Sequence, residues 1–136
     1  QFLKSKDSGE RKALEQLEDL TMTDCPDHIK FTFAMTPEER RQEQIHSSRL
    51  LASAFAKAEQ ADLLILDEFF GALSTGMIDQ DRALAYLKNK PKKLEIVLTG
   101  RDPAPEFLEL ADYVSNIEKQ KHPFDKGISA RLGIEY

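Results

Sequence analysis

The chain has 136 residues, 24 of them acidic and 19 basic, for a formal charge of −5, and its single cysteine excludes a disulfide framework. A negative charge argues against general nucleic-acid binding, and the longest apolar run is too short for a membrane-spanning helix. A chain of this length can bury roughly two-thirds of its unfolded surface in one core. We therefore expect one cytoplasmic domain, residues 1–136, that binds neither nucleic acid nor membrane.

The first half of the chain alternates strand and helix patterns. Gln1–Lys4 is typical of the end of a strand, Glu10–Leu20 has apolar residues at helical spacing, and Ile29–Phe33 alternates as a half-buried strand does. Thr36–Glu39 combines a capping residue, a proline at the first helical position and an acid three residues after the cap. This signal predicts a helix that runs to about Ala58.

The second half continues the alternation. Ala61–Glu68 is a short apolar run closed by two acids, a pattern typical of a strand buried on both faces of a parallel sheet. Asp79 is expected to cap a helix that runs to about Lys90 and ends at Pro91. The last predicted elements are a strand, a short helix and a strand: Leu94–Thr99, Pro105–Leu110 and Asp112–Ile117. This order predicts a three-layer α/β fold, with helices on both faces of a mostly parallel sheet.

Two acids stand where a predicted strand ends, at the edge where open α/β sheets bind ligands. Asp67 and Glu68, which we call the acid pair, resemble the Walker B element of P-loop nucleotide-binding proteins. In that element a carboxylate binds Mg²⁺, directly or through water, beside the nucleotide phosphates. The alternative is that the acid pair only ends the strand and caps the following turn.

A second polar group, Thr99–Arg101, follows the next predicted strand. Its glycine allows the backbone to come close to a ligand, and the guanidinium of Arg101 could lie over a phosphate. The alternative is an ion pair of Arg101 with Asp102 or Glu106 at the start of the following helix.

The phosphate-binding loop that normally accompanies a Walker B strand is not found in these residues. The pattern is Gly-x-x-x-x-Gly-Lys-Ser/Thr, and Gly71 and Gly76 have the spacing, but Met77 and Ile78 follow them. The chain cannot cradle a triphosphate in the usual way with the residues it contains.

The C-terminal segment Lys121–Tyr136 is the most specific part of the sequence, and it resembles the closing segment of the P-loop-type ATP:cob(I)alamin (corrinoid) adenosyltransferases. Further similarities occur in the order of the family's own elements. They are Gln1–Lys4 with its second strand, Phe31–Phe33 with its Phe-Thr-Trp-like stretch, Leu64–Glu68 with its Walker B element, and Leu98–Arg101 and Glu109–Val114 with its later strands.

The resemblance implies a RecA-like P-loop fold and a transferase that moves the 5′-deoxyadenosyl group of ATP to the Co(I) of a reduced corrinoid such as cobalamin, releasing triphosphate. Co(I) is the nucleophile, so no catalytic side chain is expected. Asp67 and Glu68 are implied as the Mg²⁺ and ATP carboxylates, and Arg101 as a nucleotide contact. Phe31 and Phe33, which by position alone would be core residues, are implied as the apolar surface beneath the corrin ring. Phe33 stands where the family has Trp and lacks the indole N–H.

The resemblance also implies that the family's first strand and phosphate loop, with its Lys and Mg²⁺-binding Thr, precede the matched second strand. We therefore expect an N-terminally truncated adenosyltransferase domain that has little activity by itself. The implied partners are a reductase that supplies the electron for Co(I) and a second copy in a homodimer. Two alternatives remain: a corrinoid- or partner-binding module without ATP chemistry, and a RecA-like ATPase fragment, which does not account for the C-terminal segment.

Overall fold

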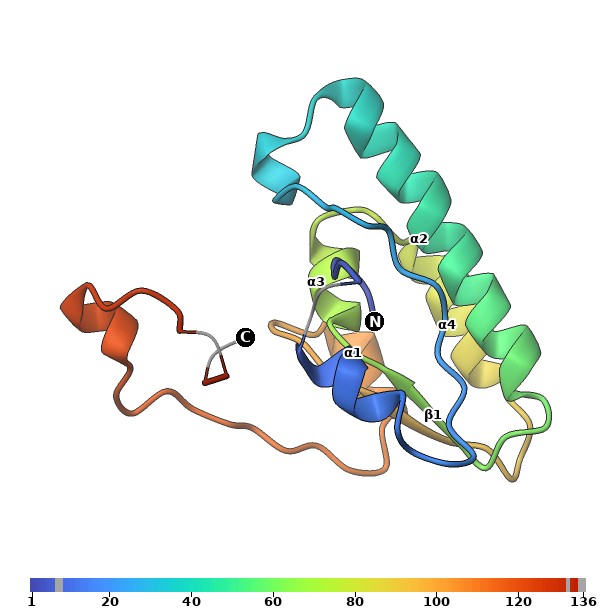
Figure 1. The fold of residues 1–136 in the computed structure, drawn as a ribbon. Helices are drawn as coiled ribbons and strands as arrows, with labels where there is room; N and C mark the ends of the chain where they lie inside the picture. Colours follow the sequence, from blue (N-terminus) through green and yellow to red (C-terminus); the bar gives the residue numbers. More distant parts are fainter. Residues whose placement is uncertain (7–8, 132, 135–136) are drawn as a thin grey trace.

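The computed structural model describes residues 1–6, 9–131 and 133–134. Figure 1 shows α2 and α4 side by side on one side of the molecule, and the C-terminal segment extending away on the other. Within the described ranges, no helix is long and apolar enough to cross a membrane. The elements in chain order are α1 (Gly9–Leu14), the 3₁₀ helix η1 (Thr32–Ala34), α2 (Pro37–Ala58), β1 (Leu63–Leu66), α3 (Phe69–Ser74), α4 (Gln80–Lys88), β2 (Glu95–Leu98), α5 (Pro105–Leu110) and the 3₁₀ helix η2 (Pro123–Lys126).

The sheet consists of β1 and β2, which run parallel with Leu64 opposite Ile96 and Leu66 opposite Leu98. The pairing continues beyond the strands, where the backbone N–H of Thr99 donates to the carbonyl of Leu66 at 3.2 Å. Because the strands are parallel, their carboxyl ends lie at the same edge. The prediction of an α/β fold with a parallel sheet is confirmed.

The helices bury one face of this sheet. The core includes buried apolar side chains from α2, α3, α4, α5 and β1, with alternate strand residues packed against them. On the opposite face Leu63, Ile65 and Val97 remain 51, 53 and 44% exposed. The buried cluster comprises Phe2, Leu50, Leu51, Ala54, Phe55, Leu66, Phe69, Ala72, Met77, Ile78, Ala83, Leu84, Leu87 and Phe107.

The two predicted capping signals are confirmed. The N–H of Glu39 donates to Oγ1 of Thr36 at 3.2 Å, and the N–H of Thr36 donates to Oε2 of Glu39 at 2.9 Å, which completes a capping box at the start of α2. At the start of α4, the N–H of Arg82 donates to Oδ1 of Asp79 at 2.8 Å. Local hydrogen bonds therefore determine the residue at which each of these two helices begins.

The predicted strand at Ile29–Phe33 is wrong. This segment leads into η1, where the N–H of Ala34 donates to the carbonyl of Phe31 at 2.8 Å. An alternating pattern produces a strand only when a neighbouring strand pairs with it and one face is buried. Here the sheet of the described residues consists of β1 and β2, and Phe31 and Phe33 are 76 and 87% exposed, so neither condition holds.

The predicted strands at Asp112–Ile117 and Gln1–Lys4 are also wrong. Asp112–Ile117 is irregular and lies in the segment that extends away from the sheet in Figure 1. Phe2 is buried and its N–H donates to the carbonyl of Asp67 at 2.9 Å, but Leu3 has a left-handed φ of +53°, which interrupts an extended strand. The sheet of the described residues consists of β1 and β2, so neither segment pairs in it as a strand, although Phe2 makes one backbone hydrogen bond.

One boundary differs from its prediction, one helix was not predicted, and the tail agrees with its prediction where it is described. The first helix ends at Leu14 instead of Leu20, and Leu17 and Leu20 are exposed. The six residues of α3 are too few to show a helical period in sequence. The tail is irregular apart from η2, as expected, and Leu132, Glu135 and Tyr136 lie outside the described residues.

Gly100 is the glycine that the packing requires most strictly. Its φ is +138°, and a Cβ there would lie 2.8 Å from Cβ and 2.9 Å from N of Phe70. We predict that Gly100→Ala lowers the free energy of unfolding by about 2–4 kcal/mol through backbone strain and overpacking. Gly76 is the matched control, because its φ is +72° but the nearest atom, on Arg40, is 3.8 Å away.

The Gly76→Ala cost should be about 1 kcal/mol, from backbone conformation alone. Urea denaturation of both variants measures the difference. Equal costs would show that the close approach to Phe70 is not a constraint.

Candidate functional site

The candidate site is formed where β1 and β2 end. Asp67 follows β1 and Thr99 follows β2, so the parallel register places them side by side. The hydroxyl of Thr99 donates to Oδ1 of Asp67 at 2.7 Å and accepts the N–H of Glu68 at 3.0 Å. One side chain from the second strand therefore holds both members of the acid pair in place, a link that the sequence pattern did not reveal.

Glu68 occupies an unusual backbone position. It has a left-handed φ of +56° and stands at the N-cap of α3, yet its side chain makes no capping hydrogen bond. Its Oε2 lies 3.4 Å from the position of a Cβ built on Gly71, so the carboxylate lies over the first turn of α3. The alternative in which Glu68 caps the turn through its side chain is therefore wrong, and this exposed carboxylate can reach a ligand.

A lysine from the N-terminal segment, Lys4, lies close enough to the acid pair for the two negative charges to affect its pKa. Lys4 Nζ forms an ion pair with Oε1 of Glu10 at 3.1 Å. Partial burial lowers the pKa of Lys4, but the hydrogen bond and charge of Glu10, with the charges of Asp67 and Glu68, outweigh burial and raise the pKa above its ordinary value. The edge therefore combines acidic groups with a cation that stays protonated at neutral pH.

Arg101 lies two residues beyond Thr99 and is exposed. Among the described residues it forms no ion pair, so the alternative pairing with Asp102 or Glu106 is not observed. Its guanidinium can therefore bind an anion at the carboxyl edge of the sheet without first breaking an ion pair.

Phe31 and Phe33, which we call the aromatic pair, form a separate surface. Their rings stack with centroids 5.4 Å apart and planes 10° from parallel, and both are strongly exposed. The alternative that they are core residues is therefore wrong. In the described part of the chain, no ring contact or hydrogen bond joins this pair to the acid pair.

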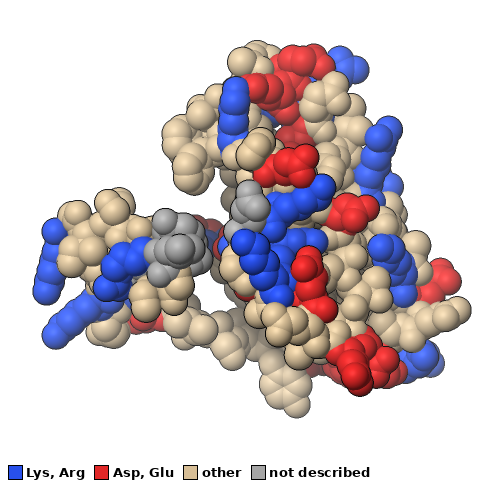
Figure 2. Space-filling model, viewed as in Figure 1, with Lys and Arg blue, Asp and Glu red and all other residues tan. Residues whose placement is uncertain are grey.

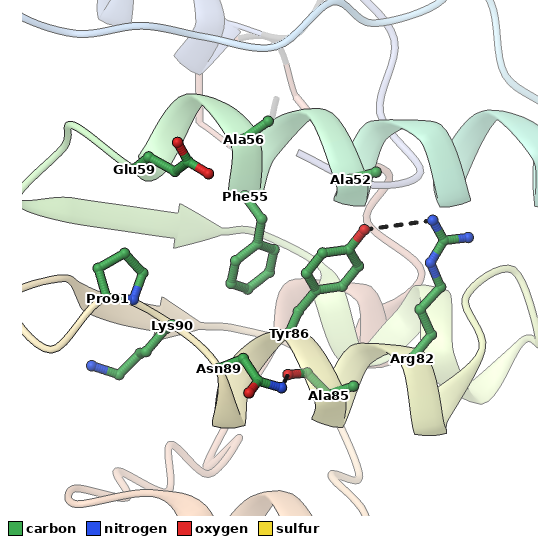
Figure 3. A pocket seen from close by; sticks show the side chains of 10 residues that line it. All are labelled: Ala52, Phe55, Ala56, Glu59, Arg82, Ala85, Tyr86, Asn89, Lys90 and Pro91. Atoms are coloured by element: carbon green, nitrogen blue, oxygen red, sulfur yellow. Dashed lines mark hydrogen bonds between the residues drawn. The ribbon is translucent and has the colours of Figure 1, made fainter.

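An open groove lies between α2 and α4 (Figure 3). Phe55 and Tyr86 stack on its floor with centroids 4.8 Å apart, and Arg82 lies over the Tyr86 ring at 5.8 Å. None of the predicted site residues lines this groove, so it is not the candidate site.

The charges on the surface do not indicate one dominant partner. Figure 2 shows acidic and basic side chains interleaved over most of the visible face. The C-terminal segment, which contains Lys119, Lys121, Lys126 and Arg131, shows several basic side chains, and others lie near the middle of the same view.

These features define an α/β protein with a candidate site at the carboxyl ends of its parallel strands, the edge where open α/β sheets usually bind ligands. Comparison with known sequences then identifies the family. The family model described as ATP:corrinoid adenosyltransferase BtuR/CobO/CobP matches residues 1–136, and the chain belongs to this family.

Several curated relatives are named corrinoid adenosyltransferase. The protein from Pseudomonas aeruginosa is 31% identical over 106 residues, which cover 78% of this chain and 52% of the relative. The protein from a Sinorhizobium species is 37% identical over 62% of this chain and 40% of the relative. The protein from Escherichia coli K12 is 32% identical over 67% of this chain and 44% of the relative. The chain thus spans about half, or less, of the length of these relatives.

The hydroxyl of Thr99 generates a stability prediction. Thr99→Val removes the donor to Asp67 and leaves the N–H of Glu68 without its acceptor. We expect the free energy of unfolding to fall by about 1–3 kcal/mol in urea denaturation. Thr99→Ser keeps the hydroxyl and is the control. Equal stability of the two variants would contradict a structural role for the hydroxyl.

Glu39 generates a pH prediction. The hydrogen bond from Lys30, followed by that from the Thr36 backbone, lowers the pKa of Glu39 from 4.5 to about 2. Its contribution to stability is therefore present above pH 4.5 and is lost as the pH falls through 2. The urea midpoint of the parent protein should decline more steeply between pH 4.5 and 2 than that of Glu39→Gln, whereas Glu38→Gln should follow the parent. Parallel declines for all three proteins would refute this assignment.

Proposed function

We propose that this chain is part of an enzyme that transfers the 5′-deoxyadenosyl group of ATP to the cobalt of a reduced corrinoid. The observation that carries the proposal is the family match over residues 1–136. In the reaction, Co(I) attacks C5′ of ATP, a Co–C bond forms, the C5′–O bond breaks, and the bonding electrons leave with triphosphate. The protein supplies position and electrostatics, because the nucleophile is the substrate's own cobalt.

We propose that Asp67 and Glu68 hold Mg²⁺ against the triphosphate. Mg²⁺ is usually bound by one or two carboxylates, together with waters and phosphate oxygens. The donors fit, because Oδ2 of Asp67 accepts only a long hydrogen bond, from Nε2 of Gln1 at 3.4 Å, while the Thr99 hydroxyl holds Oδ1, and the Glu68 carboxylate is exposed. When bound, the ion would offset charge on the departing triphosphate. Arg101 would contact the phosphates or the rest of the nucleotide.

The aromatic pair would serve the other substrate. Two stacked and exposed rings offer an apolar surface to the lower side of a corrin ring, where they would exclude water and an axial ligand. Removal of that ligand eases reduction to Co(I), for which a reductase would supply the electron. Phe33 stands where the family has Trp, so the contact here would be apolar without an indole hydrogen bond.

The architecture proposed for the whole protein is a RecA-like domain with helices on both faces of its sheet, in a homodimer. Residues 1–136 would form one such domain together with the phosphate loop that the family carries. We expect the 136-residue chain by itself to have little activity, because it contains no Gly-x-x-x-x-Gly-Lys-Ser/Thr pattern. The enzyme would serve adenosylcobalamin biosynthesis or salvage.

The test is formation of the Co–C bond, followed by absorbance, with ATP, Mg²⁺ and reduced cobalamin and the protein made from its complete coding sequence. Asp67→Asn and Glu68→Gln should each lower kcat/KM at least about 100-fold, because each removes a charge that acts on the triphosphate. Glu95→Gln is the matched control, an exposed acid at the opposite end of the same sheet.

Three outcomes separate the candidate functions. An adenosylated product that depends on the acid pair supports the transferase. Corrinoid binding without product favours a binding module, and steady release of phosphate from ATP favours an ATPase. Full activity of the Asp67 and Glu68 variants would reject the role of the acid pair.

A further inference from the structure

The aromatic pair depends on its backbone for its position. Both rings project from the short segment that precedes α2, and at 76 and 87% exposure neither is fixed by burial in the core. Their parallel stacking at 5.4 Å fixes one ring relative to the other but not to the rest of the protein. Groups that bind residues 30–36 therefore determine where this surface lies.

The carboxylate of Glu39 binds both ends of that segment. Its Oε1 accepts a hydrogen bond from Nζ of Lys30 at 2.5 Å, and its Oε2 accepts one from the backbone N–H of Thr36 at 2.9 Å. Lys30 directly precedes the aromatic pair and Thr36 follows it by three residues, so one side chain closes the segment into a loop. The carboxylate is ionised at neutral pH, which keeps the ion pair with Lys30 intact.

The next turns of α2 bind the turn that follows α3. The guanidinium of Arg40 donates to the carbonyl of Thr75, and Nε2 of Gln44 donates to the carbonyl of Gly76 at 2.9 Å. The helix α3 itself starts directly after Glu68. The first turns of α2 thus connect the segment that carries the aromatic pair to the helix that begins at the acid pair.

We propose that Glu39 is a positioning residue for corrinoid binding, which acts by holding the aromatic pair in a fixed orientation relative to the acid pair. The inference rests on the function proposed above. Glu39 touches neither substrate in this arrangement. Its loss would leave the rings present but mobile, so the corrinoid would have to order them when it binds.

The experiment uses the absence of tryptophan from these 136 residues. In the protein made from its complete coding sequence, Phe33→Trp places in the aromatic pair the one tryptophan of these 136 residues, and the signal of the Phe33 protein is subtracted as background. In that background Glu39→Gln keeps an acceptor for the Thr36 N–H but loses the ion pair with Lys30. Glu38→Gln is the matched control, because it removes the same charge from the same helical turn and its partner is Gln42 instead.

Two readouts are taken on each protein: steady-state anisotropy of the tryptophan, and quenching of its fluorescence by added cobalamin. We expect Glu39→Gln to lower the anisotropy and to weaken cobalamin binding about two- to fivefold, the range of one exposed ion pair. Lys30→Met should have the same effects, and the double variant should add nothing further. Glu38→Gln should match the parent in both readouts.

The readouts separate this inference from the proposed function. Unchanged anisotropy in Glu39→Gln would overturn the inference and leave the proposed function standing. Lower anisotropy with unchanged cobalamin affinity would also overturn it, because the ordering of the rings would then not serve binding. Absence of quenching in the Phe33→Trp protein, without a second substitution, would overturn the corrinoid role of the aromatic pair, and the inference with it.

Discussion

The parallel pairing of β1 with β2 is the constraint on which both the core and the candidate site depend. In the observed register Leu66 lies opposite Leu98, and both turn toward the helices. A slip of one residue would exchange the two faces of a strand, which would expose Leu66 and bring Asp67 toward the core. The burial of apolar side chains that stabilises the sheet thus also places Asp67 beside Thr99.

Two residues at this edge of the sheet have positive φ angles, which only a glycine adopts without strain. Glu68 has a φ of +56°, and Gly100 has a φ of +138° beside Phe70. The N–H of Phe70 donates to the carbonyl of Thr99 at 3.2 Å, and Phe69 is fully buried, so α3 is attached both to β2 and to the core. Unfavourable conformations of this kind persist only where the surrounding structure determines them. Here the core stabilises the backbone that presents the acid pair.

The sequence predicted the elements that local interactions determine. Hydrogen bonds within one turn define the starts of α2 and α4, and the apolar run before Asp67 describes a strand that lies in the sheet. The candidate acids could also be predicted, because ligands gather where parallel strands end. These features require only neighbouring residues or a general rule of α/β topology.

The features that the sequence did not predict depend on contacts between distant segments. Ile29–Phe33 and Asp112–Ile117 have strand-like patterns, but pattern alone does not supply a neighbouring strand. The hydroxyl of Thr99 binds Asp67, which is 32 residues away in the sequence, and no local sequence pattern predicts such a contact. The ion pair of Lys30 with Glu39 could not be predicted from the sequence either, although the position of Glu39 in the capping box could.

The aromatic pair illustrates why a surface proposed to bind a ligand would be held by polar contacts instead of apolar packing. Burial of a phenylalanine side chain stabilises a protein by roughly 1.5–3 kcal/mol, and Phe31 and Phe33 forgo most of that gain. Rings packed into the core would be fixed, but they would have no face left for a ligand. Hydrogen bonds and an ion pair to the backbone and flanking residues can order the segment while leaving both rings exposed. In the proposed function, the corrin ring covers both rings, and the burial of their apolar surface then contributes to the free energy of binding.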